Sequence, residues 1–234
     1  MTAVPSQCLI MSGSYIGSEM VAEFGMLPPA FLPVGNTRLY EYQVARLRGF
    51  GPIHLTVPDR FTNPADDTRR LAELQVEILP VPDDLRLGEA VVYALNLLGI
   101  GDSAVRILHG DTLLDEAFPD DSDIIAIATE LTPYSWAQVS ASEGRVRNVE
   151  TSQPGGTETP NLPVATGYFS FASSTALIRA ITLARGDFIR GVDRYIRDRA
   201  VGTWPVTSWL DFGHVQTFGS PLFWVGRNKF TPVA

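Results

Sequence analysis

Val105-Arg106-Ile107-Leu108-His109-Gly110-Asp111-Thr112-Leu113 is an apolar run of strand length that ends in a glycine and an acid. A carboxylate at the carboxyl end of a parallel strand faces the crevice in which open α/β sheets bind ligands, and a glycine lets the backbone approach a ligand closely. Asp111 is therefore well placed to hold a metal ion. The alternative on this local pattern is that Asp111 caps the next turn through an Asx hydrogen bond.

Further apolar runs of strand length surround this stretch, and segments with helical spacing separate them. This alternation is typical of βαβ units, so we predict an α/β fold with a mixed, mainly parallel sheet sandwiched by helices. The expected strands are Gln7–Met11, Ile53–Val57, Val76–Val81, Val105–His109 and Asp123–Thr129. The expected helices are Tyr40–Arg48, Asp66–Leu74, which Asp66 would cap, and Gly88–Leu98.

The pattern changes after about residue 130. Two segments flank a short polar turn and predict an antiparallel hairpin, and a polar stretch rich in Gly and Pro then predicts a loop. A strand, two amphipathic helices and an irregular segment complete the chain, which we expect to form one domain over residues 1–234. In order, these elements are Trp136–Ala141, Arg145–Thr151, Ser152–Pro163, Gly167–Phe171, Ser174–Ala184, Phe188–Arg199 and Thr203–Phe223.

Composition and charge exclude several classes of protein. No apolar stretch approaches the roughly 20 residues that cross a bilayer, and the N-terminus has no basic and apolar signal pattern, so we expect a cytoplasmic protein without a membrane span. The net charge of −8 argues against sequence-independent binding of nucleic acid. Cys8 is the single cysteine, and its apolar neighbours favour a buried structural role. Among the 18 basic residues, Lys229 is the only lysine, so a site for phosphate must rely on arginine.

A second acidic candidate lies in Trp209-Leu210-Asp211-Phe212-Gly213-His214, where Asp211 is surrounded by large apolar groups. A carboxylate in such surroundings is costly to desolvate unless a cation or hydrogen bonds compensate. Mg²⁺ typically takes one or two protein carboxylates together with phosphate oxygens. Asp111 and Asp211 are thus candidates to share one Mg²⁺ ion, while His109 and His214 beside them are either supporting partners of these acids or structural residues.

Five stretches of the chain together resemble the sugar-1-phosphate nucleotidyltransferases, and they occur in the order of that family from residue 7 to about 218. The resemblance covers almost the whole chain. Met26–Tyr42 resembles the family motif P-K-x-L-L-P-V-x-x-x-P-L-I-x-Y, and Leu87–Ala90 resembles G-T-A. His109–Leu113 resembles N-G-D, and Gly167–Phe171 resembles N-x-G-x-Y-x-F. Trp209–Gly213 resembles W-x-D-x-G.

The resemblance implies a Rossmann-like nucleotide-diphospho-sugar transferase fold, with a nucleotide-binding half, 1–130, and an acceptor half, 131–234. It also implies transfer of NMP from an NTP to a sugar phosphate or similar small phosphate, with release of pyrophosphate, in the synthesis of nucleotide sugars for polysaccharides. Mg²⁺ would be held by Asp111 and Asp211. A homo-oligomer is compatible with it. The nucleotide would contact Gly13, Ser14, Gly17, Ser18, Gly88, Glu89 and Gly110, and the acceptor would contact Thr166 and Gly167.

The chain departs from the family pattern at two cations. The Arg of the family's G-x-G-T-R loop falls on Glu19, and the Lys of its P-K motif falls on Pro29. Losing one well-placed charge donor costs about 10²–10³ in turnover. Arg86, next to Gly88, is our first candidate for a replacement catalytic cation; Arg38 and Arg227 with Lys229 are others.

Two further classes of protein remain open. The two departures favour a module that binds nucleotides or sugar phosphates without catalysis and regulates an active relative. A glycosyltransferase that uses nucleotide sugars would need a D-x-D motif at the end of a strand. The nearest string, Asp120-Asp121-Ser122-Asp123, precedes an expected strand instead, so this class ranks lowest.

Overall fold

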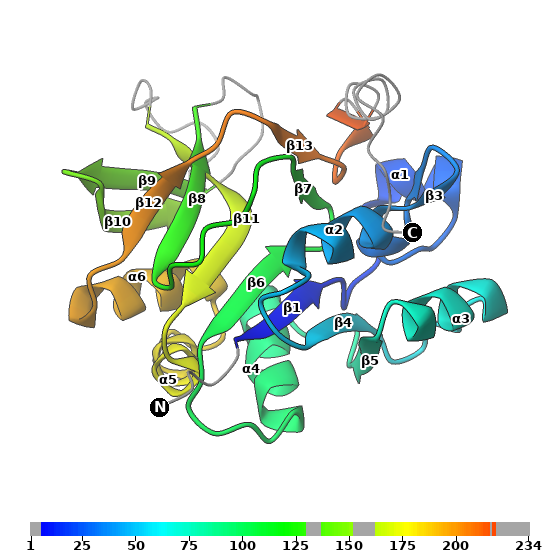
Figure 1. Ribbon diagram of the computed structural model, residues 1–234, viewed down its shortest axis with the longest axis horizontal. Helices are drawn as coiled ribbons and strands as arrows, with labels where there is room; N and C mark the ends of the chain where they lie inside the picture. Colours follow the sequence, from blue (N-terminus) through cyan, green and yellow to red (C-terminus); the bar gives the residue numbers. More distant parts are fainter. Residues whose placement is uncertain (1–5, 130–136, 152–161, 216, 219–234) are drawn as a thin grey trace.

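The computed structural model describes residues 6–129, 137–151, 162–215 and 217–218, and a nine-stranded mixed sheet organises them (Figure 1). The strand order is β5-β4-β1-β6-β11-β8-β12-β10-β9. The first four strands are parallel to one another: β5 (Val76–Val81), β4 (Ile53–Pro58), β1 (Gln7–Met11) and β6 (Val105–His109). They confirm the α/β class, and four of the five strands expected in the first half lie in this part of the sheet.

The sheet continues with strands of mixed direction. β11 (Val164–Phe171) lies between β6 and β8 (Ile124–Ala128) and is antiparallel to both. β12 (Gly202–Pro205) is parallel to β8, and β10 (Arg145–Thr151) with β9 (Ala137–Ser142) forms the expected hairpin. Strands from both halves of the chain therefore belong to one continuous sheet.

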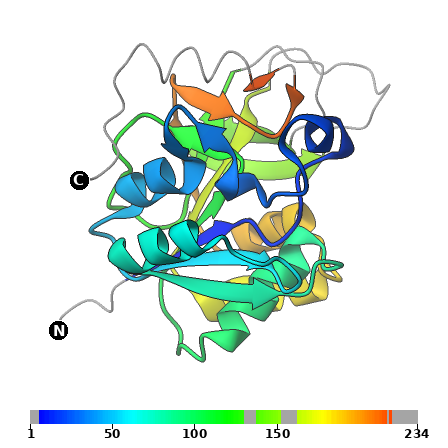
Figure 2. The ribbon, with the colours of Figure 1, turned by 90° about the vertical axis from the view of Figure 1, so that its right-hand side faces the viewer.

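Helices cover both faces of the sheet (Figures 1 and 2). Successive side chains of a strand point to opposite faces, so in β1 Leu9 packs with one set of helices and Ile10 with the other. Leu9 belongs to the core with α4 (Leu87–Leu97), α5 (Ser174–Leu183) and α6 (Phe188–Asp198). Ile10 belongs to the core with η1 (Pro29–Phe31), α2 (Leu39–Leu47) and α3 (Ala65–Glu73).

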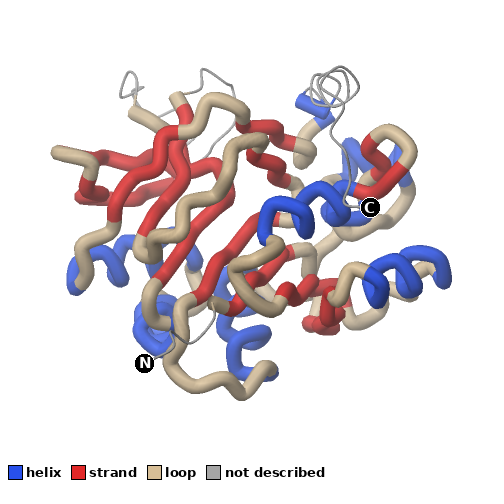
Figure 3. Tube along the Cα trace, in the orientation of Figure 1, coloured by secondary structure: helices blue, strands red, loops and turns tan. Residues whose placement is uncertain are grey.

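Short elements extend the upper part of the molecule in Figure 3. α1 (Ser18–Phe24) follows β1, and β2 (Pro33–Val34) pairs with β3 (Thr37–Arg38). β7 (Thr112–Leu114), which directly follows Asp111, pairs with β13 (Trp209–Asp211). No helix in the described part of the chain is both long and apolar enough to cross a membrane.

Three expectations need correction. Thr203–Phe223 is not irregular at its start, because its residues contribute to β12 and supply β13, two short strands whose partners are distant in sequence. Asp66 does not cap α3, since the helix begins one residue earlier with Pro64 at the cap position. The strand expected at Gly167–Phe171 begins at Val164, because pairing with β8 extends it beyond its glycine. Residues 130–136 and 152–161, which include Trp136 and most of the expected loop, lie outside the described residues.

Candidate active site

Asp111 and Asp211 lie together at the carboxyl end of β6. The pairing of β7 with β13 sets Asp211 opposite Thr112, and the amide of Phe212 donates to the carbonyl of Asp111 at 2.8 Å. A Cβ built on Gly213 would lie 2.7 Å from Asp111 Oδ2 and 3.2 Å from Asp211 Oδ1. These two oxygens are therefore separated by no more than the sum of those distances, 5.9 Å, and they face a space that only a glycine leaves open.

Hydrogen bonds fix Asp211 in this position. Its Oδ1 accepts from the amide of Gly213 at 3.0 Å, and its Oδ2 contacts His214 Nδ1 at 2.8 Å and accepts from Thr217 Oγ1 at 2.9 Å. The side chain of Asp211 is only 10% exposed. His214 is thus a partner of the acid, one of the two roles considered for it from the sequence.

The electrostatics of the pair favour a cation. Burial raises the pKa of the Asp111 carboxyl, the negative charge of Asp211 raises this pKa further, and His109 lowers it. Burial lowers the pKa of His109, although the charge of Asp111 opposes this shift, so the positive charge that His109 can offer Asp111 is weakened. A divalent cation between the carboxylates would offset both the desolvation of Asp111 and the repulsion between the two acids.

The donor set fits Mg²⁺ better than a metal that needs an all-protein cage. Within the described residues, no group of three or more His, Cys, Asp and Glu could hold a metal ion. Mg²⁺ commonly binds through one or two carboxylates and takes its other ligands from water and substrate phosphates, with oxygens at about 2.1 Å. Two acids within 5.9 Å suit such an ion, directly or through one of its waters.

Gln43 on α2 holds the loop that carries Asp111, and the sequence analysis missed it. Its side chain is fully buried, and Nε2 contacts the carbonyls of His109, Gly110 and Thr112 at 3.0, 3.1 and 2.8 Å. An amide donor facing three carbonyls fixes the course of the loop on both sides of the acid. The sequence does carry a signal for Gln43: it is a polar residue at a helix position that the apolar pattern predicts to be buried.

The expected phosphate loop leaves the sheet beside Asp111. The amide of Gly110 donates to the carbonyl of Met11 at 2.9 Å, and a Cβ on Gly110 would lie 2.8 Å from that oxygen, so the two chain segments touch. Gly13 packs against the sheet instead of a free surface, because a Cβ there would lie 2.3 Å from Val81 Cγ2. By contrast, the remaining residues expected to bind the nucleotide in this loop are exposed: Ser14, Gly17 and Ser18.

The two residues expected to contact the acceptor are also next to the acids. Gly167 has a φ of +94°, and a Cβ there would lie 2.7 Å from Thr112 Oγ1, so a glycine is required by both the backbone and the packing. Thr166 is buried, and its hydroxyl donates to the carbonyl of Ala126 at 3.3 Å. The Thr166 side chain therefore turns into the sheet, and only its backbone, which accepts from Thr112 Oγ1 at 3.2 Å, faces the loop of Asp111.

Arg86, Gly88 and Glu89 form the start of α4 and interact with the turn before α6. Arg86 Nη2 contacts Glu89 Oε1 at 2.7 Å and also donates to the carbonyl of Arg185, while Glu89 Oε2 accepts from the amide of Arg86 at 3.0 Å. A Cβ on Gly88 would lie 2.5 Å from the carbonyl of Gly186. Arg86 would have to leave Glu89 to reach a phosphate.

The positions of the two missing cations differ in their surroundings. Glu19 is exposed in the first turn of α1, and Pro29 begins η1. Arg38, another candidate replacement, is held by Asp67 in two hydrogen bonds of 3.1 Å and donates to the carbonyl of Phe31. Arg227 and Lys229 lie outside the described residues.

The string Asp120-Asp121-Ser122-Asp123 has a structural role at the other end of the sheet. It precedes β8, and Asp123 Oδ1 accepts from the amide of Ala172 at 2.9 Å and from Tyr195 Oη at 2.6 Å. The carbonyl of Asp120 accepts from Arg106 at 2.8 Å. These contacts give no support to a D-x-D metal site.

Comparison with known proteins rests on structure alone, because no protein-family model and no curated protein matches the chain by sequence. The inositol-1-phosphate CTP transferase from T. maritima has a TM-score of 0.76 at 12% identity, over 100% of both chains. A nucleoside-diphosphate-sugar pyrophosphorylase from Vibrio cholerae RC9 has a TM-score of 0.73 at 14% identity, over 93% of this chain and 99% of the other. The CTP:phosphocholine cytidylyltransferase from Streptococcus pneumoniae has a TM-score of 0.72 at 13% identity, over 95% and 100%.

These similarities show that the chain has the nucleotidyltransferase fold. They confirm the fold that the five sequence motifs implied, and the match extends over nearly the full length of each of the three similar structures. At identities of 12–14% they concern the fold and not the substrates.

Proposed function

We propose that this chain, which has the nucleotidyltransferase fold, transfers NMP from an NTP to a small phosphate acceptor and releases pyrophosphate. The observation that carries the proposal is the meeting of Asp111 and Asp211, within 5.9 Å of each other, at the carboxyl end of β6. Ligands of open α/β sheets bind at this edge. A sugar phosphate is the first acceptor to consider, because the structural neighbours include a nucleoside-diphosphate-sugar pyrophosphorylase.

In this proposal Asp111 and Asp211 hold Mg²⁺, which when bound neutralises the triphosphate and orients it for in-line attack by the acceptor phosphate. His214 and Thr217 keep Asp211 in the orientation required, and Gln43 does the same for the Asp111 loop. No nucleophile from the protein is required, since the acceptor phosphate attacks the α-phosphate directly.

The loop after β1 and the start of α4 are proposed to supply the remaining contacts to the nucleotide. The exposed loop residues Ser14, Gly17 and Ser18 lie on the segment that follows β1 and can present amide N–H groups to phosphates. Gly110, next to Asp111, touches Met11 and Ser12 at the start of that loop, and Gly13 packs against Val81 of the sheet. Gly88 and Glu89 are proposed beside the base, Arg86 as the replacement cation, and Thr166 and Gly167 beside the acceptor through their backbone.

A pyrophosphate-release assay tests this function. Purified protein with Mg²⁺ is offered each NTP with a sugar phosphate, inositol-1-phosphate or phosphocholine, the acceptor classes named for the structural neighbours. Asp111→Asn and Asp211→Asn should each lower turnover by at least about 10²-fold, the scale of losing one electrostatic stabiliser. Asp66→Asn removes an exposed acid on α3 and should leave turnover unchanged. Turnover that survives both substitutions at the paired acids contradicts the metal assignment.

A second function is favoured by Glu19 and Pro29, which replace two cations of the family pattern. In that case the chain binds nucleotides or sugar phosphates without transferring NMP, and it regulates a catalytically active relative. Calorimetric titration with each NTP and Mg²⁺ separates the two functions. Tight binding without pyrophosphate release from any pair of substrates identifies the binding module, and release identifies the enzyme.

A further inference from the structure

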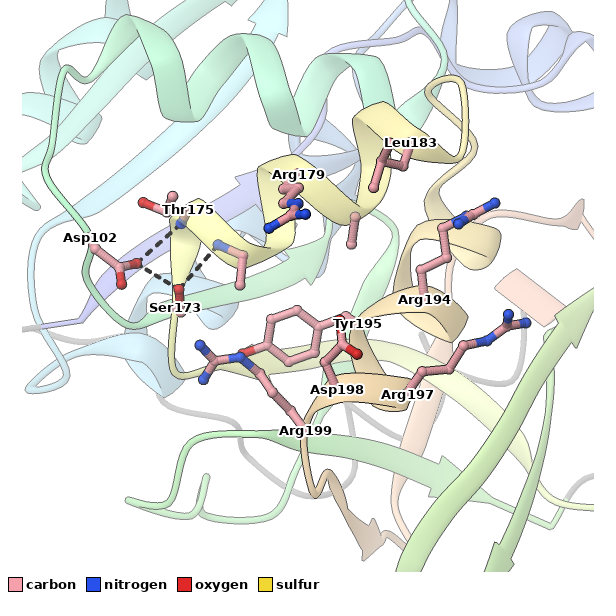
Figure 4. Close-up of a pocket in the computed structure, with 12 residues that line it drawn as sticks. Asp102, Ser173, Thr175, Arg179, Leu183, Arg194, Tyr195, Arg197, Asp198 and Arg199 are labelled. Atoms are coloured by element: carbon pink, nitrogen blue, oxygen red, sulfur yellow. Dashed lines mark hydrogen bonds between the residues drawn. The ribbon is translucent and has the colours of Figure 1, made fainter.

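A cavity of about 690 Å³ lies between α5 and α6, at the opposite end of the strands from Asp111 (Figure 4). Asp102 on its rim precedes β6, whereas Asp111 follows β6. Ser173, also on the rim, follows β11, which runs antiparallel to β6 and ends where β6 begins. The cavity is therefore separate from the candidate active site.

Positive charge is concentrated around this cavity. Four of its lining residues are arginines: Arg179 on α5, Arg194 and Arg197 on α6, and Arg199, which follows α6. Over residues 174–199 the sequence has six Arg and three Asp with no Glu or Lys, a net charge of +3. The whole chain carries −8, so the rest of it carries −11. This charge separation favours an anionic ligand at one place on an otherwise acidic protein.

Two of the four guanidinium groups are available for a ligand. Arg197 pairs with Asp193 at 2.6 Å, and Arg199 lies over the ring of Tyr195, 5.3 Å from its centroid. Arg179 and Arg194 are exposed and have no ion pair or hydrogen bond within the part of the chain that the structure describes. Both line the cavity, Arg179 from α5 and Arg194 from α6, and Figure 4 shows the guanidinium of Arg194 directed away from Arg179.

Two acids also line the cavity, and one of them, Asp102, is hydrogen-bonded at the start of α5. Asp102 Oδ1 accepts from Ser173 Oγ at 2.7 Å and from the amide of Thr175 at 3.1 Å, and these bonds lower the pKa of the Asp102 carboxyl. Its charge thus serves the beginning of α5. Asp198 is the other acid of the lining and is exposed on α6. The arginines of the cavity outnumber these acids by four to two.

We propose that this cavity binds a small molecule carrying more than one phosphoryl group. Its volume falls within the roughly 300–1,000 Å³ of small-molecule sites. Planar guanidinium groups match phosphate oxygens in pairs, and Arg179 and Arg194 line the cavity from two different helices, so these exposed side chains can turn to engage separate phosphoryl groups. Ala176, Ala180 and Leu183 add an apolar wall beside them, which suits the organic part of such a molecule.

Isothermal titration with inorganic pyrophosphate, in EDTA so that no divalent cation is present, tests the site. The double variant Arg179→Gln/Arg194→Gln should weaken binding at least tenfold. Arg147→Gln is the matched control, because Arg147 is exposed on β10 and its loss changes the net charge in the same direction. Binding to the control and to Asp211→Asn should stay within twofold of the wild type, which keeps this site distinct from the candidate active site.

Three results would overturn the site: no binding of pyrophosphate by the wild-type protein at millimolar concentration, equal affinity in the double variant, or a loss that follows Asp211→Asn instead. Both arginine substitutions are of exposed side chains, and a thermal melt of each variant verifies that it is folded. Since EDTA removes the divalent ion that the proposed transfer requires, the outcome is independent of whether the chain is a nucleotidyltransferase.

Discussion

The side-chain amide of Gln43 donates to the carbonyl of Thr112 at 2.8 Å, across 69 residues of sequence. Two more carbonyls of the same loop, those of His109 and Gly110, lie within 3.1 Å of the same nitrogen. α2 is thereby attached to the turn that presents Asp111. The position of the acid depends on a residue that touches neither the metal nor the substrate in the proposed reaction.

Gln43→Leu should destabilise the protein by about 2–3 kcal/mol, since buried carbonyls left without a donor each cost on the order of 1–3 kcal/mol. Mg²⁺ affinity should also fall, by about tenfold or more, because residues that orient metal ligands typically matter on that scale. Urea unfolding and Mg²⁺ titration measure the two effects. Gln138→Leu on β9 is the control and should shift stability by no more than about 0.5 kcal/mol. Unchanged Mg²⁺ affinity in the Gln43 variant would show that it has no positioning role.

Gly213→Ala should separate folding from metal binding. The added Cβ would meet Asp111 Oδ2 at 2.7 Å and Asp211 Oδ1 at 3.2 Å, so the two carboxylates must shift against the hydrogen bonds that hold Asp211. We expect a stability loss of about 1–2 kcal/mol, since Gly213 is half-buried and the added methyl group must displace two side chains without unfolding the short strand β13. Mg²⁺ affinity and turnover should fall by about tenfold or more as the carboxylates are displaced.

Gly101→Ala is the control for this substitution, because a Cβ at Gly101 would meet nothing within 4 Å. It should match the wild type in both stability and Mg²⁺ affinity. If Gly213→Ala also binds Mg²⁺ as the wild type does, the space between the two acids is not where the ion binds.

The two acids could be found from sequence because each has a local signal. Asp111 follows an apolar strand and a glycine, and Asp211 is an isolated acid between aromatic neighbours. Their meeting depends on β13, a three-residue strand whose partner β7 is almost 100 residues earlier, and no local pattern marks so short a strand. Gln43 was missed for the same reason, since its three acceptors are distant in sequence.

The central strands were predicted nearly to the residue because a buried strand is a continuous apolar run. The cap of α3 was not, because Asp66 has the residue type of a cap while Pro64, one position before the helix, sets its start. The ion pair of Arg86 with Glu89 was not predicted either, although the two residues lie only three positions apart. Sequence placed Arg86 beside the proposed nucleotide but did not show that its charge is already engaged.

Stability should fall below about pH 6.5 in part through His54. Burial lowers the pKa of this histidine, although Glu77, 2.9 Å from Nδ1, offsets some of the shift. The unfolded chain, with an ordinary histidine pKa of about 6.5, therefore binds the proton more readily than the folded protein does. The contribution is present above that pH and is lost as the pH falls toward the pKa of the folded state.

Urea unfolding of the wild type and of His54→Gln at pH 7.5 and 5.5 isolates this contribution. The glutamine can keep the contact that His54 Nε2 makes with Gln7 Oε1 at 2.9 Å but cannot take up a proton. Its free energy of unfolding should decline less between the two pH values. Equal declines would mean that other groups account for the loss.

The thiol of Cys8 should be inert in the folded protein and reactive only on unfolding. The side chain has no exposed surface, and burial raises its pKa to about 12. At pH 8 the fraction present as thiolate, the reactive form, is then about 10⁻⁴. A colorimetric disulfide reagent should label less than one tenth of the protein in an hour under native conditions and all of it in denaturant.

Since the chain has one cysteine, the rate under native conditions reports opening of the strand β1 that leads to the proposed phosphate loop. Rapid native labelling would show that this strand opens locally, and a Cys8→Ala variant, which cannot react, gives the background.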